Sequence, residues 1–472
     1  MERRHPTHGC TGDGNRTGGC RGEHYLQGEI TMPFFQSPCR LHSVSIERIT
    51  KMSIPGLLPA LTLLGSGTAL AADAPGANAA DTVWILISSA LVMLMLPGLA
   101  LFYGGMVQTK NVLSSHMHSF VALAVVGILW VFTGYSLSFG TGNAWIGDLS
   151  QFLLIGTTPD SLTGTIPTYA FVMFQGMFAI ITPALISGTI AERMKFSTYV
   201  VFILLWSFFV YNPVAHWVWG GGWLAKMGVL DFAGGIVVHL TAGISSLAIV
   251  ALIGKRQGYP GEQFVPHNLA MTVLGVGLLW FGWFGFNAGS ALAANASAAL
   301  AFTTTMVAGA AAATSWMLME WWLLGKPSAL GLASGIVAGL GSITPAAGFV
   351  TPAAALLIGL VAGALCYYGV RLKFKMGYDD SLDVVGVHGV GGIWGPIATG
   401  IFATVGGQGL LSGNAHQLQV QVIAVAAVGF YCYAVTYLLG WLLDKTMGLR
   451  VDEDQELIGL DRELHGEVGY SL

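Results

Sequence analysis

The sequence predicts an all-α polytopic membrane protein that crosses the bilayer eleven times. Only 9% of its 472 residues are charged, 54% are hydrophobic and the mean hydropathy is +0.67, whereas an average soluble protein is about 25% charged. Apolar runs long enough to span a bilayer repeat along the chain. The loops between them alternate in positive charge, as membrane topology requires. This composition excludes a soluble enzyme and a disordered chain, and a net charge of −4 excludes a nucleic-acid binder.

The N-terminal region differs from the rest of the chain. Residues 1–51 are polar and hold 7 of the 20 Lys and Arg residues. Residues 52–71 form an apolar run that ends in Ala69-Leu70-Ala71, an order typical of a cleaved signal peptide. We therefore expect residues 1–51 to be an upstream segment with a mis-assigned start, and translation to begin at Met32 or Met52. The alternative is a cytoplasmic extension with an uncleaved first helix.

Eleven apolar runs follow, and together they predict a transmembrane domain over residues 72–443. They lie near 82–106, 114–139, 167–191, 196–216, 232–254, 267–290, 296–324, 328–345, 351–372, 382–404 and 417–443. The eighth and tenth runs are rich in Gly rather than Leu. The remaining residues, 444–472, predict a charged C-terminal tail.

Loop charges predict the orientation. The loops after the odd-numbered runs contain nine Lys and Arg residues, whereas the loops after the even-numbered runs contain only Lys226. Because cytoplasmic loops carry the excess of positive charge, the mature N-terminus should lie outside and the tail in the cytoplasm.

An odd number of spans predicts two five-helix halves of opposite orientation plus one extra helix, a common plan in transporters. A short internal repeat agrees with this plan. Val238-His239 and Gly243 in the fifth run align with Val387-His388 and Gly392 in the tenth.

His239 and His388 are the main polar groups within the runs, where a polar side chain is costly and therefore needs a reason. One such histidine is typical of a satisfied core residue, but two at matching positions favour a shared pore site. A zinc site would need three or four ligands, and neither Cys366 nor Cys432 lies in these two runs. We expect no metal and no cofactor, and the sequence shows no triad or carboxylate pair that would indicate an enzyme.

Two aspartates open the spans that carry the histidines. Asp231 precedes the fifth run and Asp383 opens the tenth. Both fit helix N-caps, because a carboxylate accepts hydrogen bonds from free backbone N–H groups. Asp231 also fits an anion that attracts cations to the outer mouth.

Aromatic side chains gather near the proposed outer mouth. Phe174 and Phe178 are one helical turn apart and share a face. Trp219 precedes three glycines, and Phe286 and Ser290 are also one turn apart. Alone, these aromatics fit core packing or an interface belt. A Trp face with a Ser hydroxyl also suits a small ammonium-type cation, at about 0.5–2 kcal/mol for the cation–π part.

Together these stretches make residues 81–470 similar to the bacterial ammonium transporters of the Amt/Mep/Rh family. The matching stretches are Gly104-Gly105, Phe174 to Phe178, Ala191-Glu192-Arg193, Trp219 to Gly222, Asp231 to His239, Gly282 to Ser290, Asp383 to Gly389, and Gly448-Leu449-Arg450. The resemblance implies eleven helices with an inverted five-plus-five repeat. It also implies a homotrimer in the inner (plasma) membrane, with one pore in each subunit.

The resemblance assigns roles at the outer end of that pore. Trp219, Ser290 and Phe178 correspond by position to the outer recruitment site for ammonium. Phe178 and Phe286 correspond to the stacked gate below it, and Phe174 is a neighbour of the gate. A site of this kind would collect ammonium, and an apolar pore would then exclude hydrated ions.

Roles deeper in the pore follow in the same way. His239 and His388 resemble the twin histidines that line the lumen and relay a proton, with Trp283 nearby. Asp231 resembles a structural acid at the outer end. The histidine pair would guide ammonia through the pore.

The resemblance also suggests a partner and two rival functions. In this family the tail packs on the cytoplasmic face and helps to dock a PII-type signalling protein, and we expect the same here for 444–472. One rival is an ammonium sensor, although a tail of 29 residues is too short for a fused kinase or cyclase. The other is a neutral-gas channel of the Rh type for ammonia or carbon dioxide. Rh-like proteins generally lack the outer Trp, so Trp219 favours the Amt type.

Overall fold

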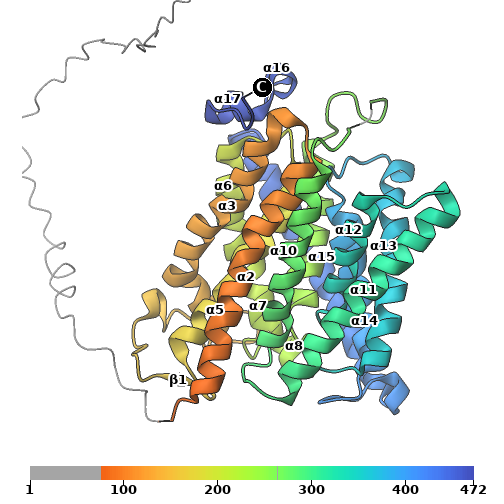
Figure 1. Cartoon of the computed structure of the whole chain (residues 1–472). Helices are drawn as coiled ribbons and strands as arrows, with labels where there is room; N and C mark the ends of the chain where they lie inside the picture. Colours follow the sequence, from red (N-terminus) through yellow and green to blue (C-terminus); the bar gives the residue numbers. More distant parts are fainter. Residues whose placement is uncertain (1–75, 263, 472) are drawn as a thin grey trace, which may run out of the picture. The chain divides into compact units, whose positions relative to one another are not determined.

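The computed structural model describes residues 76–262 and 264–471. The predicted upstream segment 1–51 and signal peptide 52–71 lie outside these residues. Within the described part, long apolar helices dominate, and they run side by side as a bundle (Figure 1).

Each of the eleven predicted runs overlaps a helical segment of the described chain. The first five segments are α2 (Ala79–Met106); η3, α3, η4 and α4 (Thr109–Asn111, Val112–Leu129, Trp130–Gly134 and Tyr135–Phe139); α5 (Thr168–Ile190); α6, η6 and α7 (Phe196–Trp206, Ser207–Tyr211 and Asn212–Val218); and η7 with α9 (Gly235–Leu240 and Thr241–Ile253). The others are α10 (Leu269–Gly289), α11 (Ala296–Leu324), α12 (Ala329–Ile343), α13 (Pro352–Met376), η8 with α14 (Val385–Gly389 and Val390–Phe402), and α15 (Ala415–Thr446).

The eighth segment is the exception in length. Ten described segments are long and apolar enough to cross a membrane, whereas α12 has 15 residues. At about 1.5 Å per residue it falls short of a hydrocarbon core of about 30 Å. It packs against α10, α11, α13 and α14, so that most of its surface is covered by protein rather than by lipid.

Side-chain caps explain where several helices begin. A polar side chain just before each of six helices accepts the backbone N–H three residues later, which satisfies one of the free donors of the first turn. These caps are Asn78, Asn268, Asn295, Ser328, Thr351 and Asn414. At these six capped helices the predicted starts lie within three residues of the observed ones.

Short elements join the long helices. A two-stranded antiparallel hairpin, β1 (Leu162–Thr163) with β2 (Ile166–Pro167), pairs Thr163 with Ile166 before α5. One turn of helix, α8 (Trp223–Lys226), follows α7, and the 3-10 turns η5 (Phe152–Leu154) and η9 (Leu410–Ser412) lie in loops. After α15, the tail forms α16 (Glu453–Ile458) and α17 (Leu460–His465), which lie at the opposite end of the bundle from β1 and α8 (Figure 1).

The two segments that carry the predicted pore histidines cross at glycines. A Cβ atom on Gly243 would lie 2.2 Å from the backbone nitrogen of Gly389, and one on Gly392 would lie 2.5 Å from that of Leu240. Only glycine fits at both crossings. The two contacts are equivalent. Gly243 and Leu240 of the first segment correspond to Gly392 and Gly389 of the second, 149 residues further along the chain. Each segment therefore uses the same glycine position to contact the same backbone position of the other.

Both segments also open with a π-helical turn, η7 and η8. A π-helical turn contains one more residue than an α-helical turn and often marks a functional site. His239 lies in η7 and His388 in η8. The same irregular turn thus presents each histidine to the interior of the bundle.

Candidate functional site

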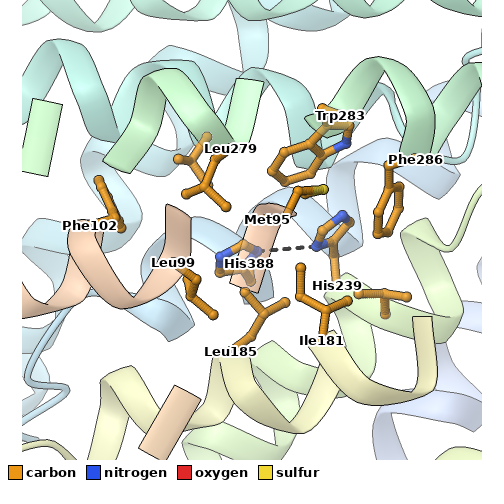
Figure 2. Close-up of a pocket in the computed structure, with 12 residues that line it drawn as sticks. Met95, Leu99, Phe102, Ile181, Leu185, His239, Leu279, Trp283, Phe286 and His388 are labelled. Carbon is orange, nitrogen blue, oxygen red and sulfur yellow. Dashed lines mark hydrogen bonds between the residues drawn. The ribbon is translucent and has the colours of Figure 1, made fainter. Parts of the chain in front are cut away.

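The two predicted pore histidines contact each other at the centre of the bundle. The Nδ1 atoms of His239 and His388 are 3.2 Å apart, and the nearly parallel rings have centroids 5.2 Å apart (Figure 2). Both side chains are buried. Because a bond between two Nδ1 atoms needs one donor and one acceptor, the two rings must differ in which nitrogen carries the proton.

The histidines line a narrow lumen. Besides these two rings and the Trp283 indole, the lining is apolar: Met95, Leu99, Phe102, Ile181, Leu185, Val238, Leu279, Phe286 and Val337 (Figure 2). The volume of about 10 Å³ suits one water-sized molecule. His239 Nε2 has no hydrogen-bond partner among the described residues, so this nitrogen is free to bind a small polar molecule.

Trp283 forms one wall of the lumen. Its ring stacks on His239 with centroids 5.3 Å apart, and its Nε1 donates a 3.0 Å hydrogen bond to Thr344 Oγ1. The bond fixes the indole on α10 against the residue that follows α12. The predicted neighbourhood of Trp283 and the histidines is therefore present.

Phe178 and Phe286 lie between the lumen and a second cavity. Their rings are in contact, tilted by 40° with centroids 4.3 Å apart. Phe286 lines the lumen and Phe178 lines the second cavity. Phe174 lines neither; it packs behind Phe178, edge to face at 5.0 Å. The predicted pair thus separates the lumen from the second cavity, and Phe174 packs against it.

This second cavity, which we call the far cavity, opens at the end of the bundle opposite the tail. It has a volume of about 360 Å³, and its lining includes Phe178, Trp219, Asp231 and Ser290. Trp219 meets Phe178 edge to face at 5.9 Å. The structure therefore brings together the three side chains that the resemblance assigns to a recruitment site.

Hydrogen bonds fix the polar groups of the far cavity. Trp219 Nε1 donates to the Asp231 carbonyl at 2.9 Å, which orients the indole. Ser290 Oγ donates to the Phe286 carbonyl at 2.9 Å. The donor of this hydroxyl is thereby used, and its oxygen lone pairs stay available as acceptors.

The Asp231 carboxylate is a structural group rather than a free anion. Its two oxygens accept the backbone N–H groups of residues 234–237 at 2.6–3.1 Å. Burial raises the pKa of Asp231 to about 6, against the lowering effect of these four N–H donors. The carboxyl group is therefore still ionised at neutral pH, where it caps η7.

The predicted capping role of Asp383 is wrong. Asp380 caps η8 instead, because its Oδ2 accepts the N–H of Val385 at 2.7 Å. Asp231 likewise binds the N–H of Ile236, five residues onward. Each of these aspartates lies five residues before the N–H group that it binds. Asp383 lies too close to Val385, the first residue of η8, to reach it in the same way. It forms an ion pair with Lys373.

Sequence reasoning missed a cluster of buried charges near the tail. Arg256 bridges Glu192 and Asp379 at 2.6 and 2.9 Å, and Arg193 lies 3.6 Å from Asp379. Burial lowers the pKa of Arg256, but the two carboxylates raise it above its usual value. Burial raises the pKa of Asp379, but the two arginines outweigh this and lower it. The motif Ala191-Glu192-Arg193 was the only signal of this cluster in the sequence.

A third cavity, the tail-side cavity, has a volume of about 530 Å³. It is lined by Arg256, by the ion pair of Lys373 with Asp383, and by the loop around Phe264. The far cavity, the gate, the lumen and this cavity thus supply the parts of a path through the bundle.

The comparisons with known proteins agree with this geometry. The model of the Ammonium Transporter Family matches residues 83–470. An ammonium transporter of Bacillus subtilis is 50% identical over 398 residues, which cover 83% of this chain and 98% of that protein.

Two solved structures are also similar. The crystal structure of Candida albicans Mep2 is 35% identical with a TM-score of 0.77, and the match covers 82% of this chain and 89% of that one. A structure described as a sensor Amt protein is 29% identical with a TM-score of 0.77, over 82% of this chain and 98% of that one. The chain therefore belongs to the ammonium transporter family.

Proposed function

We propose that this multi-pass membrane protein transports ammonium across the inner (plasma) membrane through a pore within each subunit. The observation that carries the proposal is the buried contact between His239 and His388, in an apolar lumen behind a pair of phenylalanines. A lumen of about 10 Å³ accepts ammonia but is too small for a hydrated ion.

The first step is capture in the far cavity. Trp219 and Phe178 offer ring faces, and Ser290 offers a hydroxyl oxygen. A cation over an aromatic ring gains about 0.5–2 kcal/mol, and the hydroxyl accepts one of the four N–H groups. Potassium has no N–H to donate, so the hydroxyl favours ammonium.

The second step is passage through the gate. Phe178 and Phe286 close the way with rings in contact, and beyond them an unpaired charge would lose its hydration without compensation. Neutral ammonia crosses this region far more cheaply than the ion does. The proton of ammonium is therefore passed to water at or above the gate, from which it either stays outside or follows through the histidine pair.

In the lumen, His239 and His388 receive the molecule. The hydrogen bond between their Nδ1 atoms links the two rings into a short chain along which a proton can be relayed. Trp283 closes one side by stacking on His239. The net charge that crosses depends on whether the proton follows ammonia along this chain.

The orientation and assembly complete the proposal. Nine positive loop residues against one support an N-terminus outside and a tail inside, which places the far cavity outside. The reciprocal contacts of Gly243 and Gly392 support an inverted five-plus-five repeat plus one extra helix. By family resemblance, the chain forms a homotrimer and offers the tail at 444–472 to a PII-type protein. The apolar run that ends in Ala69-Leu70-Ala71 supports a signal peptide at 52–71.

The deciding experiment measures current after an ammonium pulse in liposomes that contain the purified protein. We expect a current with ammonium, none with potassium, and a changed current in the His239→Ala/His388→Ala double variant. His416→Ala is a matched control, because this histidine is exposed and lies outside the three cavities.

The other outcomes select other functions. Alkalinisation of the liposome interior without current would identify a neutral ammonia channel. The absence of both signals in intact trimers would favour a sensor, the function named for one of the similar structures.

A further inference from the structure

We propose that Gln175 is a specificity-determining residue of the outer site, and that its side-chain amide oxygen accepts a hydrogen bond from the ammonium ion held there. The inference rests on the proposed function, since it concerns the same site. It adds a hydrogen-bond acceptor that the aromatic rings and Ser290 do not supply.

Gln175 occupies a buried position in the wall of the far cavity. It lies on α5 between Phe174 and Phe178, and its side chain lines the far cavity together with Phe178, Trp219 and Ser290. It is only 9% exposed. A flexible polar side chain is thus held beside the gate residue Phe178 in the wall of the far cavity.

The hydrogen bonding of the Gln175 amide oxygen supports the same role. Oε1 of Gln175 is buried and has no hydrogen-bond partner among the described residues. A buried acceptor without a partner is costly, and buried amides in proteins are normally hydrogen-bonded. A glutamine retained for packing alone would be expected to find a donor nearby. Because this oxygen is covered by protein, it reaches an ion in the far cavity only when the amide turns toward that cavity.

The neighbouring polar groups already form hydrogen bonds with other groups of the protein. The Asp231 carboxylate accepts four backbone N–H groups. Trp219 Nε1 can only donate, and it donates to the Asp231 carbonyl. Ammonium brings four N–H donors, so the site needs more acceptors than Ser290 Oγ provides.

The terminal amide can turn by about 180° at little cost, which exchanges the positions of its oxygen and nitrogen. With the oxygen toward the cavity, Gln175 and Ser290 present two directional acceptors below the rings. A potassium ion prefers a fuller shell of oxygens. Two directional acceptors therefore favour ammonium more than potassium.

The test compares three variants in the liposome current assay. Gln175→Met removes the oxygen and keeps the length of the side chain, whereas Gln175→Glu keeps an acceptor oxygen at the same place. Met173→Leu is the control, because Met173 lies on the same helix and is 39% exposed on its outer surface. Ammonium KM and maximal current are measured for each, with potassium as competitor.

We expect Gln175→Met to raise the ammonium KM about tenfold, the factor for one lost hydrogen bond to a charged donor, and to weaken discrimination against potassium. Maximal current should change much less. Gln175→Glu and Met173→Leu should keep KM near the wild-type value or, for the glutamate, lower it.

Two results would overturn the proposal. One is an unchanged KM in folded Gln175→Met protein. The other is an equal rise in Gln175→Met and Gln175→Glu, which would mean that shape rather than the acceptor matters. Should Gln175→Met fail to fold, Gln175→Leu replaces it, and a raised KM in Gln175→Glu is then decisive against the proposal. Failure of the wild-type protein to respond to ammonium would instead refute the proposed function.

Discussion

At the residue scale, the contact between His239 and His388 constrains both rings. One Nδ1 donates and the other accepts across 3.2 Å, so one ring presents a bare Nε2 and the other an Nε2–H group. The pair therefore offers one acceptor and one donor to the molecules it meets. Ammonia, which both donates and accepts, can bind at either end.

The Trp219 ring should set the affinity for ammonium. In the variant Trp219→Leu the cation–π face is lost, along with the bond to the Asp231 carbonyl. We expect the ammonium KM to rise about 2- to 30-fold, which corresponds to about 0.5–2 kcal/mol. Concentration series of the liposome current measure this. Trp322→Leu is the control, because Trp322 is 78% exposed; equal effects in the two variants would contradict the assignment.

The Phe286 ring should exclude other ions. It separates the far cavity from the lumen by packing against the Phe178 ring, with centroids 4.3 Å apart. In Phe286→Ala the two spaces would join, and water could enter with hydrated ions. We expect a potassium current that the wild-type protein lacks. Phe284→Ala, which removes a ring stacked on Phe302 away from the pore, should keep potassium out.

The residues of the site were predictable to different degrees. His239 and His388 could be found because a buried polar residue in an apolar span stands out. Trp219, Phe178 and Ser290 were placed only by resemblance, since aromatic residues are common in membrane helices. Gln175 was missed, because its meaning depends on the absence of a hydrogen-bond partner, and only coordinates show that.

At the element scale, the Asp231 carboxylate organises the start of η7. We expect Asp231→Ala to destabilise the protein by roughly 2–5 kcal/mol, because it leaves four buried backbone donors without a partner. Asp231→Asn should cost less, since one oxygen remains. The thermal unfolding midpoint in detergent measures both.

Asp148→Ala is the matched control for this prediction. The Asp148 carboxylate accepts hydrogen bonds from Thr141 and Ser150 in an exposed loop. Bonds from Ser150 and Thr141 lower the pKa of Asp148 to about 2, but their exposure makes the loss small. A midpoint shift as large as that of Asp231→Ala would refute the structural role of Asp231.

The helices were predictable and the turns within them were not. Hydropathy identifies a segment that is apolar throughout, so all eleven runs were found, including α12. The boundary between η8 and the preceding loop was not found, because Asp380 and Asp383 are alike in sequence. Only the path of the chain decides which carboxylate reaches the free N–H groups.

At the scale of the whole molecule, the tail is attached to the bundle by specific bonds. The Asp461 carboxylate accepts the N–H groups of Leu113 and Ser114 at 3.0 and 2.8 Å, at the start of α3. Lys110 donates to the carbonyls of Glu456 and Leu457. Asp461 of the tail thus caps the start of α3, and Lys110 in η3 binds carbonyls of the last turn of α16.

We expect Asp461→Ala to loosen this attachment, because the start of α3 loses two charge-assisted bonds. Hydrogen exchange over residues 453–471 should become faster by about tenfold or more if one or two such bonds of about 1.5–3 kcal/mol are lost. Glu463→Ala is the control, since Glu463 is more exposed and makes no side-chain hydrogen bond among the described residues. Unchanged exchange in Asp461→Ala would show that other contacts hold the tail.

The family resemblance implied that the tail packs on the cytoplasmic face, but the contacts that dock it could not be predicted from the sequence. Charge and shortness indicate a solvated end, and nothing in the local pattern points to Leu113, which lies 348 positions away. Hydropathy reports the partition between lipid and water, and that partition sets the spans. Contacts between polar groups at the end of the bundle depend on the completed fold.

The π-helical turns η7 and η8 make the pore sensitive to the length of the chain. Each turn contains one residue more than an α-helix needs, and each residue of a helix adds about 100° of rotation. Deleting one residue between 235 and 240, or between 385 and 389, would restore a regular helix and turn one histidine away from the other. An engineer who exchanges segments between such proteins must therefore conserve the number of residues here as strictly as the two histidines themselves.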